Sequence, residues 1–125
     1  TALVDGTGNV VERYLYDAYG KAKILDPDFA ADADNRSDFG NATLYTGREL
    51  DLATGIYYYR ARYYSAELGR FVGRDPKEAD DNLYRYCGST PLASVDPTGE
   101  QAQARGRTNA QCCSAFRRQF PNVIE

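Results

Sequence analysis

The 125-residue sequence carries 15 Lys and Arg against 18 Asp and Glu, a net charge of −3, and it contains no His and no Trp. This balance gives no electrostatic reason to expect nucleic acid or an anionic membrane as a partner, and no apolar run approaches the ~20 residues that cross a bilayer. The absence of His excludes Ser-His and Cys-His catalytic pairs and most zinc sites, so we expect no metal and no cofactor.

The chain begins at Thr1, contains no Met and opens with no signal-like segment. We therefore expect a fragment or a processed product, whose secretion signal would lie elsewhere. The three cysteines are Cys87, Cys112 and Cys113, and an odd number leaves at least one thiol unpaired within a monomer. Free thiols, or one bridge from Cys87 to the C-terminal tail, both remain open.

Tyrosine dominates the composition, with 11 residues, most of them between Tyr45 and Tyr86. Tyrosine favours the half-buried surface of a β-sheet, whereas helices favour Leu, Ala and Glu. The composition therefore predicts an all-β fold of short Tyr-rich strands and hairpins.

The predicted elements of the first part are two strands and a loop. Turn dipeptides at residues 5–9 precede a strand over 10–17, and Tyr19-Gly20 turns the chain into a short partner strand over 21–25. Residues 26–42 are rich in Asp, Asn, Gly and Ala without periodicity, which predicts a surface loop or insertion.

In the second part, a strand is expected to begin at 44–46 and a turn or hairpin loop to follow over 47–55. Residues 56–64 alternate most clearly and predict one continuous strand, with arginines between tyrosines on one face. A short strand is expected at 70–72. Residues 1–99 carry a net charge of −5 and residues 100–125 a net charge of +2, so composition and charge change together near Gly99.

Three stretches resemble known patterns. Residues 8–25, GNVVERYLYDAYGKAKIL, resemble one YD repeat, and residues 44–76, with TGRELD, TGIYYYRARYY, GRF and DP in order, resemble the RHS-associated core. Residues 82–99 resemble the segment that ends in the DPxG signature. The motif positions that carry the resemblance are Tyr16, Asp17, Gly20, Gly47, Gly55, Tyr63, Tyr64, Gly69, Arg70, Phe71, Pro76, Tyr84 and Pro97.

The resemblance implies that the chain is the closing end of a YD-repeat β shell, a spiral ribbon with an irregular C-terminal tail. The implied divisions are a last repeat (1–25), an insertion (26–42), a core with a self-cleavage segment (43–99) and a variable tail (100–125). The remaining repeats of the parent protein would be partners, the tail would be cargo, and the parent would be secreted or at the cell surface. Short strands without a helical layer also need neighbouring repeats to pack against, which leaves an oligomer or larger assembly open.

The resemblance further implies an aspartic-type autoprotease that cuts the tail free near Gly99 and Glu100. Asp75 and Asp96 each precede a proline, and two carboxylates held close share a proton, which supplies both an acid and a base. Arg62 would hold a carboxylate or stabilise developing negative charge.

Other interpretations stay open. Asp-Pro pairs are common turn residues, and Arg62 in an alternating strand suits stacking on tyrosines. The chain is then a structural or adhesive β shell that cuts no bond. A third hypothesis makes 100–125 an effector or export tag, although 26 residues are too few for a folded enzyme.

Two departures from the family pattern concern the expected site. Glu78, Asp80 and Asp81 stand where the pattern has glycines, in a segment that is shorter than in the pattern, and Glu100 stands where the pattern has Leu. A charged residue fits an apolar specificity pocket poorly. Cleavage is therefore expected to be lost, slowed or shifted if Glu100 must enter such a pocket.

Overall fold

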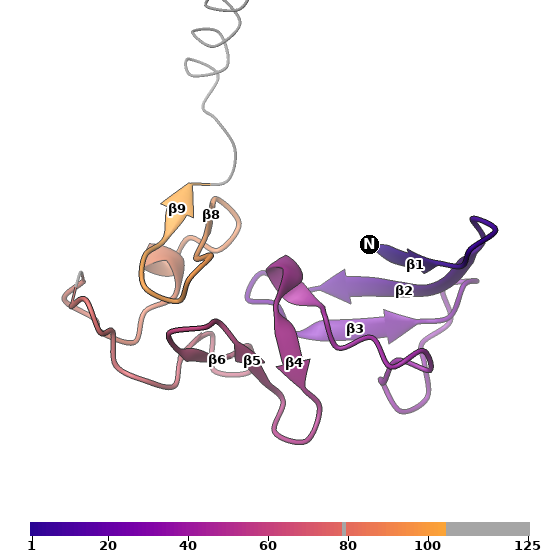
Figure 1. Cartoon of the computed structure of the whole chain (residues 1–125), viewed down its shortest axis with the longest axis horizontal. Helices are drawn as coiled ribbons and strands as arrows, with labels where there is room; N and C mark the ends of the chain where they lie inside the picture. Colours follow the sequence, from indigo (N-terminus) through magenta and orange to yellow (C-terminus); the bar gives the residue numbers. More distant parts are fainter. Residues whose placement is uncertain (79, 105–125) are drawn as a thin grey trace, which may run out of the picture.

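The computed structural model describes residues 1–78 and 80–104, and its regular elements are short antiparallel β-strands. Three small sheets follow one another along the long axis of the molecule (Figure 1). Two 3-10 turns, η1 (Tyr45–Gly47) and η2 (Cys87–Ser89), lie between them, and the described residues contain no α-helix. The all-β expectation is confirmed. Within these ranges no helix has the length and apolarity that a membrane crossing requires.

The first sheet contains the two strands expected from the sequence and a third. β2 (Val10–Tyr16) lies between β1 (Ala2–Val4) and β3 (Ala22–Leu25), and both neighbours run antiparallel to it. Alternation along β2 places Tyr14 on the buried face and Leu15 on the exposed one.

Residues 26–42 lie outside the named strands, and side chains tie this segment to the first sheet. Asn35 accepts a hydrogen bond from the backbone N–H of Ile24 at 2.8 Å and donates to the carbonyl of Ala22 at 3.2 Å. Buried Glu12 accepts from the hydroxyl of Tyr14 and, at 3.0 Å, from the N–H of Asp38. Polar side chains thus attach this segment to the sheet in addition to an isolated bridge between Leu25 and Ala31.

The second sheet corrects the expectation of one strand over 56–64. That stretch is a hairpin in which β5 (Ile56–Tyr58) pairs with β6 (Tyr63–Ser65). Arg60 lies in the turn with φ +68°, which ends the extended run. The turn also shifts the alternation, so Arg62 is buried together with Tyr57, Tyr59 and Tyr64 and does not lie on a face of stacked tyrosines.

The expected strand at 44–46 is also wrong, because these residues enter the η1 turn, where Gly47 N–H donates to Leu44 O at 3.0 Å. The segment 47–55, expected to be a loop, contains β4 (Glu49–Asp51), which pairs with β5. The sheet is completed by β7 (Arg70–Phe71), which pairs with β6. The positive φ of Thr46 at +52° marks the point where strand geometry is interrupted.

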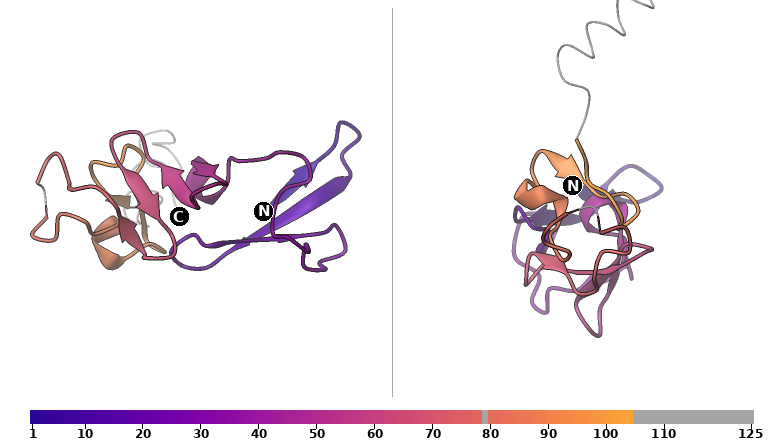
Figure 2. Two further views of the ribbon diagram at one scale, coloured as in Figure 1. Left: turned by 90° about the horizontal axis from the view of Figure 1, so that it is seen from below. Right: turned by 90° about the vertical axis from the view of Figure 1, so that its left-hand side faces the viewer.

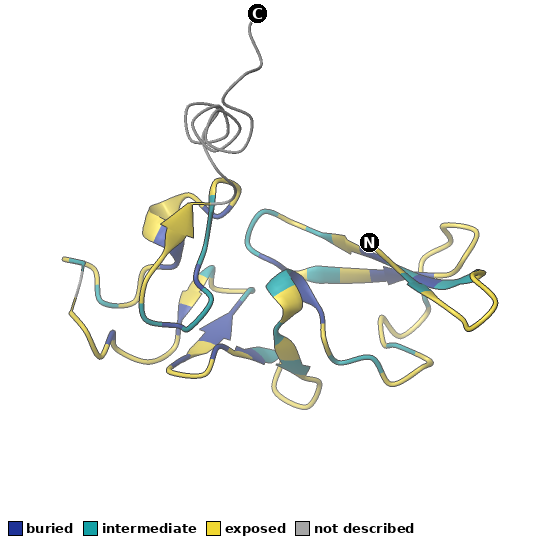
Figure 3. Ribbon diagram, turned by 45° about the horizontal axis from the view of Figure 1, so that its top comes forward, coloured by how far each residue is buried: buried dark blue, intermediate teal, exposed yellow. Residues whose placement is uncertain are grey.

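Aromatic rings form the core. The buried rings of Tyr59, Tyr64, Phe71 and Tyr86 all contact one another, with centroids 4.3–5.7 Å apart. Buried residues gather where β5 and β6 face the end of the first sheet (Figure 3). Most pairs are tilted or edge-on, the arrangements that aromatic quadrupoles favour.

Tyrosine hydroxyls dock this core on the turn between β2 and β3. Tyr45, Tyr57 and Tyr64 donate to the carbonyls of Ala18, Gly20 and Tyr19 at 3.0, 3.0 and 2.6 Å, respectively. Asp17 shapes this turn by accepting from the N–H groups of Tyr19 and Lys21, both at 2.9 Å. Gly20 has φ +90°, and a Cβ there would lie 2.2 Å from the Tyr45 ring. The Tyr-Asp-x-x-Gly pattern therefore encodes a turn with room for a neighbouring ring.

The last pair of strands positions the candidate site. β8 (Ser94–Val95) pairs with β9 (Gln103–Ala104), and the chain between them returns toward the hairpin of β5 and β6. The contact is direct, because Ala61 N–H donates to Thr98 O at 3.1 Å. Seen along the long axis, the segments surround a common centre (Figure 2).

Candidate active site

A pocket of about 210 Å³ lies between the turn of the β5–β6 hairpin and the two Asp-Pro segments. Its lining is mainly charged and includes Arg62, Asp75, Asp80, Arg85, Asp96 and Glu100. The structure thus brings together the three side chains that the sequence singled out for chemistry and one of the two residues at the expected cut.

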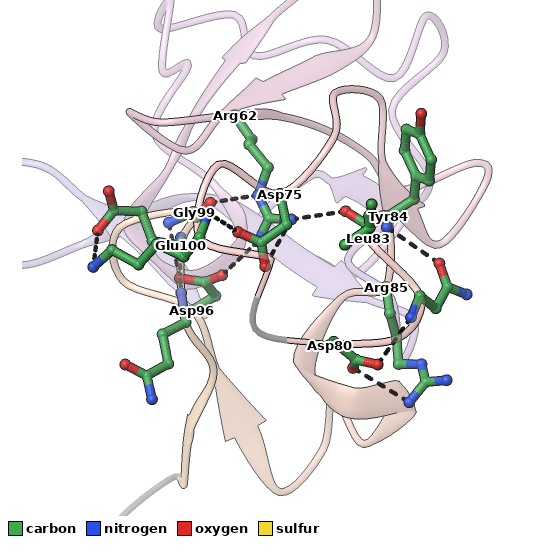
Figure 4. Close-up of polar contacts among 12 residues, drawn as sticks. Arg62, Asp75, Asp80, Leu83, Tyr84, Arg85, Asp96, Gly99 and Glu100 are labelled. Carbon is green, nitrogen blue, oxygen red and sulfur yellow. Dashed lines mark hydrogen bonds and ion pairs between the residues drawn. The ribbon is translucent and has the colours of Figure 1, made fainter.

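Arg62 occupies the centre of this group (Figure 4). It is the last residue of the hairpin turn, 6% exposed, and its guanidinium lies 3.7 Å from the centroid of the Phe71 ring. Nε donates to the carbonyl oxygen of Gly99, and Nη1 donates to that of Leu83 at 3.2 Å. A planar guanidinium with five donors suits such divided contacts, which a lysine would not reproduce.

Both aspartates reach the same guanidinium. Asp75 Oδ2 lies 3.7 Å from Nη1 of Arg62, and Asp96 Oδ2 lies 3.4 Å from Nη2. Asp75 is 6% exposed and Asp96 is 2% exposed. One buried cation therefore faces two buried carboxylates, and such a group is stable only while its charges stay paired.

Asp96 fixes the loop that follows it. Its Oδ1 accepts the backbone N–H groups of Thr98 (3.2 Å), Gly99 (2.8 Å), Glu100 (3.2 Å) and Gln101 (3.3 Å). Such a side chain acts as the cap of a turn, which agrees with the turn interpretation of Asp-Pro. The same contacts also place a carboxyl oxygen next to the nitrogen of the Gly99–Glu100 peptide bond.

Asp75 is held in a similar way on the other side of Arg62. Its Oδ1 accepts the Lys77 N–H at 2.8 Å, and its own N–H donates to Leu83 O at 2.8 Å. Each aspartate thus uses one carboxyl oxygen for its own turn and directs the other at the arginine.

The peptide bond between Gly99 and Glu100 lies within this arrangement. Arg62 contacts its carbonyl oxygen, and Asp96 contacts its nitrogen. Gly99 has φ +74°, and a Cβ there would lie 2.6 Å from Tyr59 O and 3.1 Å from Arg62 N. Only glycine fits this close approach without strain.

Glu100 lies beside a cation and does not enter an apolar pocket. Its Oε2 lies 2.7 Å from Nζ of Lys77, and its side chain is 33% exposed. The hydrogen bond to Glu100 raises the pKa of the Lys77 ammonium above its usual value. An ionised Glu100 is therefore accommodated by a nearby cation and by solvent.

Several contributors to the site carry no signal in the sequence. Arg48 donates from Nη2 to the Pro97 carbonyl at 2.5 Å, and Ala61 and Leu83 act through backbone groups. Arg48 is part of the TGRELD stretch, but its distance from residue 97 along the chain hides the contact. Backbone contacts of this kind depend on the tertiary fold and leave no residue-type pattern.

The motif positions serve mainly the fold around the site. Tyr64 and Phe71 are buried in the core, Tyr16 packs on Tyr45 with ring centroids 5.7 Å apart, and exposed Tyr63 packs on exposed Tyr58. The glycines among the motif positions all have positive φ and lie in turns: Gly20, Gly47, Gly55 and Gly69. Arg70 forms an isolated bridge with Arg85, and Tyr84 O accepts from Phe71 N–H at 2.9 Å. Pro76 and Pro97 follow the two aspartates.

Some expectations fall partly or wholly outside the described residues. Cys112 and Cys113 lie there, and so does the tail beyond residue 104; Cys87 is buried at 3% exposure. Among residues 1–78 and 80–104, no group of three or more His, Cys, Asp or Glu side chains could hold a metal ion.

Comparison with known proteins places this chain within much longer relatives, although no family model matches it. It is 36% identical over 102 residues to salivary gland surface protein 1 of Aedes aegypti, which is 82% of this chain and 3% of that protein. It is 36% identical over 104 residues to the tRNA nuclease WapA of Bacillus subtilis strain 168, covering 78% of this chain and 4% of the relative. Toxin subunit YenC1 of Yersinia entomophaga is 36% identical over 98 residues, 77% of this chain and 9% of the subunit.

Solved structures agree with these relatives. The crystal structure of TcdB2-TccC3-Cdc42 matches with a TM-score of 0.64 at 32% identity, over 80% of this chain and 4% of that chain. The crystal structure of TcdB2-TccC3 matches with a TM-score of 0.64 at 33% identity, over 79% of this chain and 5% of that chain. Each of these matches covers 77–82% of this chain, whereas this chain spans less than a tenth of each of these relatives.

Proposed function

Because the chain belongs to the RHS/YD-repeat proteins and corresponds to their C-terminal core region, we propose that it closes a β shell and cuts its own C-terminal tail free inside that shell. The scissile bond is Gly99–Glu100. The shell is completed by the other repeats of the same polypeptide, and the tail from residue 100 onward is the cargo.

One observation carries the cleavage proposal: the same peptide group is contacted on its oxygen by Arg62 and on its nitrogen by Asp96. A donor on the carbonyl oxygen polarises the carbonyl and stabilises the oxyanion of a tetrahedral intermediate. A carboxylate that accepts the N–H of the same peptide holds the bond in place beside the paired carboxyl groups, which provide the proton that the leaving amine needs. Both side chains are buried, which strengthens electrostatic contacts of this kind.

The reaction is hydrolysis by water. One carboxylate removes a proton from a water molecule as its oxygen bonds to the Gly99 carbonyl carbon, and Arg62 holds the negative charge that develops on the carbonyl oxygen. The C–N bond then breaks, and the second carboxyl gives its proton to the Glu100 nitrogen. Asp75 and Asp96, which both contact Arg62, supply this base and acid between them. The products are a Gly99 carboxylic acid and a Glu100 amine, which become a carboxylate and an ammonium group when the proton passes from one to the other.

Intact-mass measurement of the complete protein tests this proposal. The wild type should yield a cut species with a new N-terminus at Glu100, whereas Asp75→Asn and Asp96→Asn should each stay uncut. The amide retains an oxygen that accepts the turn hydrogen bonds but cannot cycle a proton. Asp81→Asn is the matched control, because Asp81 is an exposed carboxylate in the same segment and should cut as the wild type does.

A new N-terminus at Gln101 would move the cut by one bond, which the contact between Asp96 Oδ1 and Gln101 N–H also permits. Unchanged cleavage in both asparagine variants would reject the paired-carboxylate mechanism.

The second candidate function is a shell that cuts nothing. It is favoured by the four N–H groups on Asp96 Oδ1, since a carboxylate so fully used is well suited to a purely structural turn. A single intact species that retains residues 82–125 would support it. Salivary gland surface protein 1 suits such a surface role, whereas toxin subunit YenC1 suits release of a cargo. Under either function we place the parent protein outside the cell or at its surface.

A further inference from the structure

Lys77 and Glu100, the latter a departure from the family pattern, contact each other at the mouth of the site. Lys77 follows Asp75-Pro76 directly, and Glu100 follows Gly99. Their side chains form an ion pair of 2.7 Å, although the residues are far apart in the sequence. Figure 4 shows Glu100 beside Gly99 and apart from Asp80 and Arg85, which line the same pocket.

We propose that Lys77 is a specificity-determining residue that selects an acidic side chain at position 100 and so positions the Gly99–Glu100 bond on Arg62 and Asp96. The inference rests on the proposed cleavage and concerns what the site accepts after Gly99. Lys77 selects the side chain that follows Gly99 by its charge, as an apolar pocket would select leucine.

The ion pair joins two segments that are each anchored to a catalytic aspartate. The Lys77 N–H donates to Asp75 Oδ1 at 2.8 Å, and the Glu100 N–H donates to Asp96 Oδ1 at 3.2 Å. Both aspartates contact Arg62. The side-chain pair therefore closes a ring of contacts around the scissile peptide, and its release would free one side of that ring.

The neighbouring charges have other partners. Glu78 pairs with Arg74 at 2.7 Å, and Asp80 pairs with Arg85 at 3.3 Å. Besides Glu100, the charged group that raises the pKa of Lys77 is Asp75, through a weaker effect. Glu100 is therefore the carboxylate that forms an ion pair with Lys77, and the two opposite charges complement each other.

The pair is exposed enough to leave folding almost unchanged when it is altered. The side chain of Lys77 is 54% exposed and that of Glu100 is 33% exposed. Exposed ion pairs contribute little to stability. Variants should consequently fold, and their effect should appear in the cleavage rate and in the protection of the cleavage loop.

Charge exchange in the complete protein tests the inference. Lys77→Glu and Glu100→Lys should each slow cleavage roughly three- to tenfold, as expected when an exposed attraction becomes a repulsion. The double variant should return to within about twofold of the wild type, since the attraction is restored in reverse. Lys77→Arg should cut like the wild type. Lys21→Glu is the control, because Lys21 forms a comparable exposed pair with Glu67 at 2.6 Å, outside the site, and should not change the rate.

Single variants that cut at the wild-type rate, or a double variant slower than both singles, would overturn the inference.

Hydrogen exchange gives a readout independent of cleavage. In Asp75→Asn protein, which stays uncut, Lys77→Glu should speed amide exchange at residues 98–101 and the double exchange should restore protection. Unchanged amide exchange in Lys77→Glu would overturn the inference even if the wild type never cuts. If every form stays uncut but Lys77→Glu does speed exchange, only the proposed cleavage is rejected.

Discussion

Arg62 donates from Nε to the carbonyl oxygen of Gly99, so a buried cation contacts the backbone at the point where the family pattern of the sequence ends. The guanidinium stacks on the Phe71 ring, and Asp75 and Asp96 lie on either side of it. This relationship connects the hairpin of the second sheet to the loop between β8 and β9. It makes the geometry of the loop depend on one side chain.

Arg62→Lys should lower the cleavage rate by about 10²-fold, the usual effect of losing one donor to a developing oxyanion. Lysine keeps the charge between the two aspartates but lacks the planar fork that reaches Gly99 and Leu83 together. The measurement is the rate at which the cut species appears in intact-mass spectra. A lysine variant that cuts as fast as the wild type would show that charge alone suffices.

Gly99→Ala should displace the loop from Arg62 and reduce cleavage at least tenfold, because its Cβ would lie 2.6 Å from Tyr59 O. Gly55→Ala provides the control: Gly55 has a similar φ of +70° but open space around its Cβ position. It carries only the backbone cost of about 1–2 kcal/mol. Equal cleavage by the two alanine variants would contradict the close-approach argument.

Gly20→Ala should destabilise the chain by roughly 2–5 kcal/mol, combining the left-handed backbone cost with overpacking against Tyr45. The Cβ would lie 2.2 Å from that ring. Gly8→Ala shares the φ of +90° without a neighbour within 4 Å, so it should cost only the backbone part. Urea unfolding followed by near-ultraviolet circular dichroism compares the two, and the clash would be refuted by similar midpoints.

Alkaline pH should unfold the chain as the buried tyrosines are forced to ionise. Burial raises the pKa of Tyr57, Tyr59, Tyr64 and Tyr86, so their neutral forms are favoured in the fold. A group whose pKa is raised on folding contributes stability that is complete below its unfolded pKa, about 10 for tyrosine, and is lost as pH rises above it.

Absorbance of tyrosinate at 295 nm, recorded with the circular dichroism signal between about pH 9 and 12, checks this prediction. The buried tyrosines should ionise together with loss of the tertiary signal. Complete ionisation with the tertiary signal intact would contradict the burial of the four rings.

The sequence alone determined the class of fold and the identity of the main polar residues. Tyrosine content and turn residues predicted short β-strands, and the strands at 10–17 and 21–25 appear as β2 and β3. The resemblance to the RHS core selected Asp75, Asp96, Arg62, Gly99 and Glu100, which lie together in the structure. Residue type and order suffice for the strands because turns and strand periodicity are local properties, whereas the site residues were selected by the family resemblance.

Tertiary structure decided how those residues meet. A turn at Arg60 divided the expected strand over 56–64, and the resulting change of alternation buried Arg62 against Phe71. The contact of Lys77 with Glu100 and that of Arg48 with Pro97 join segments far apart in sequence. Such contacts depend on how the sheets pack, because a positive φ in one turn changes the direction of the side chains that follow. The local sequence pattern does not indicate which distant residue such a side chain will contact.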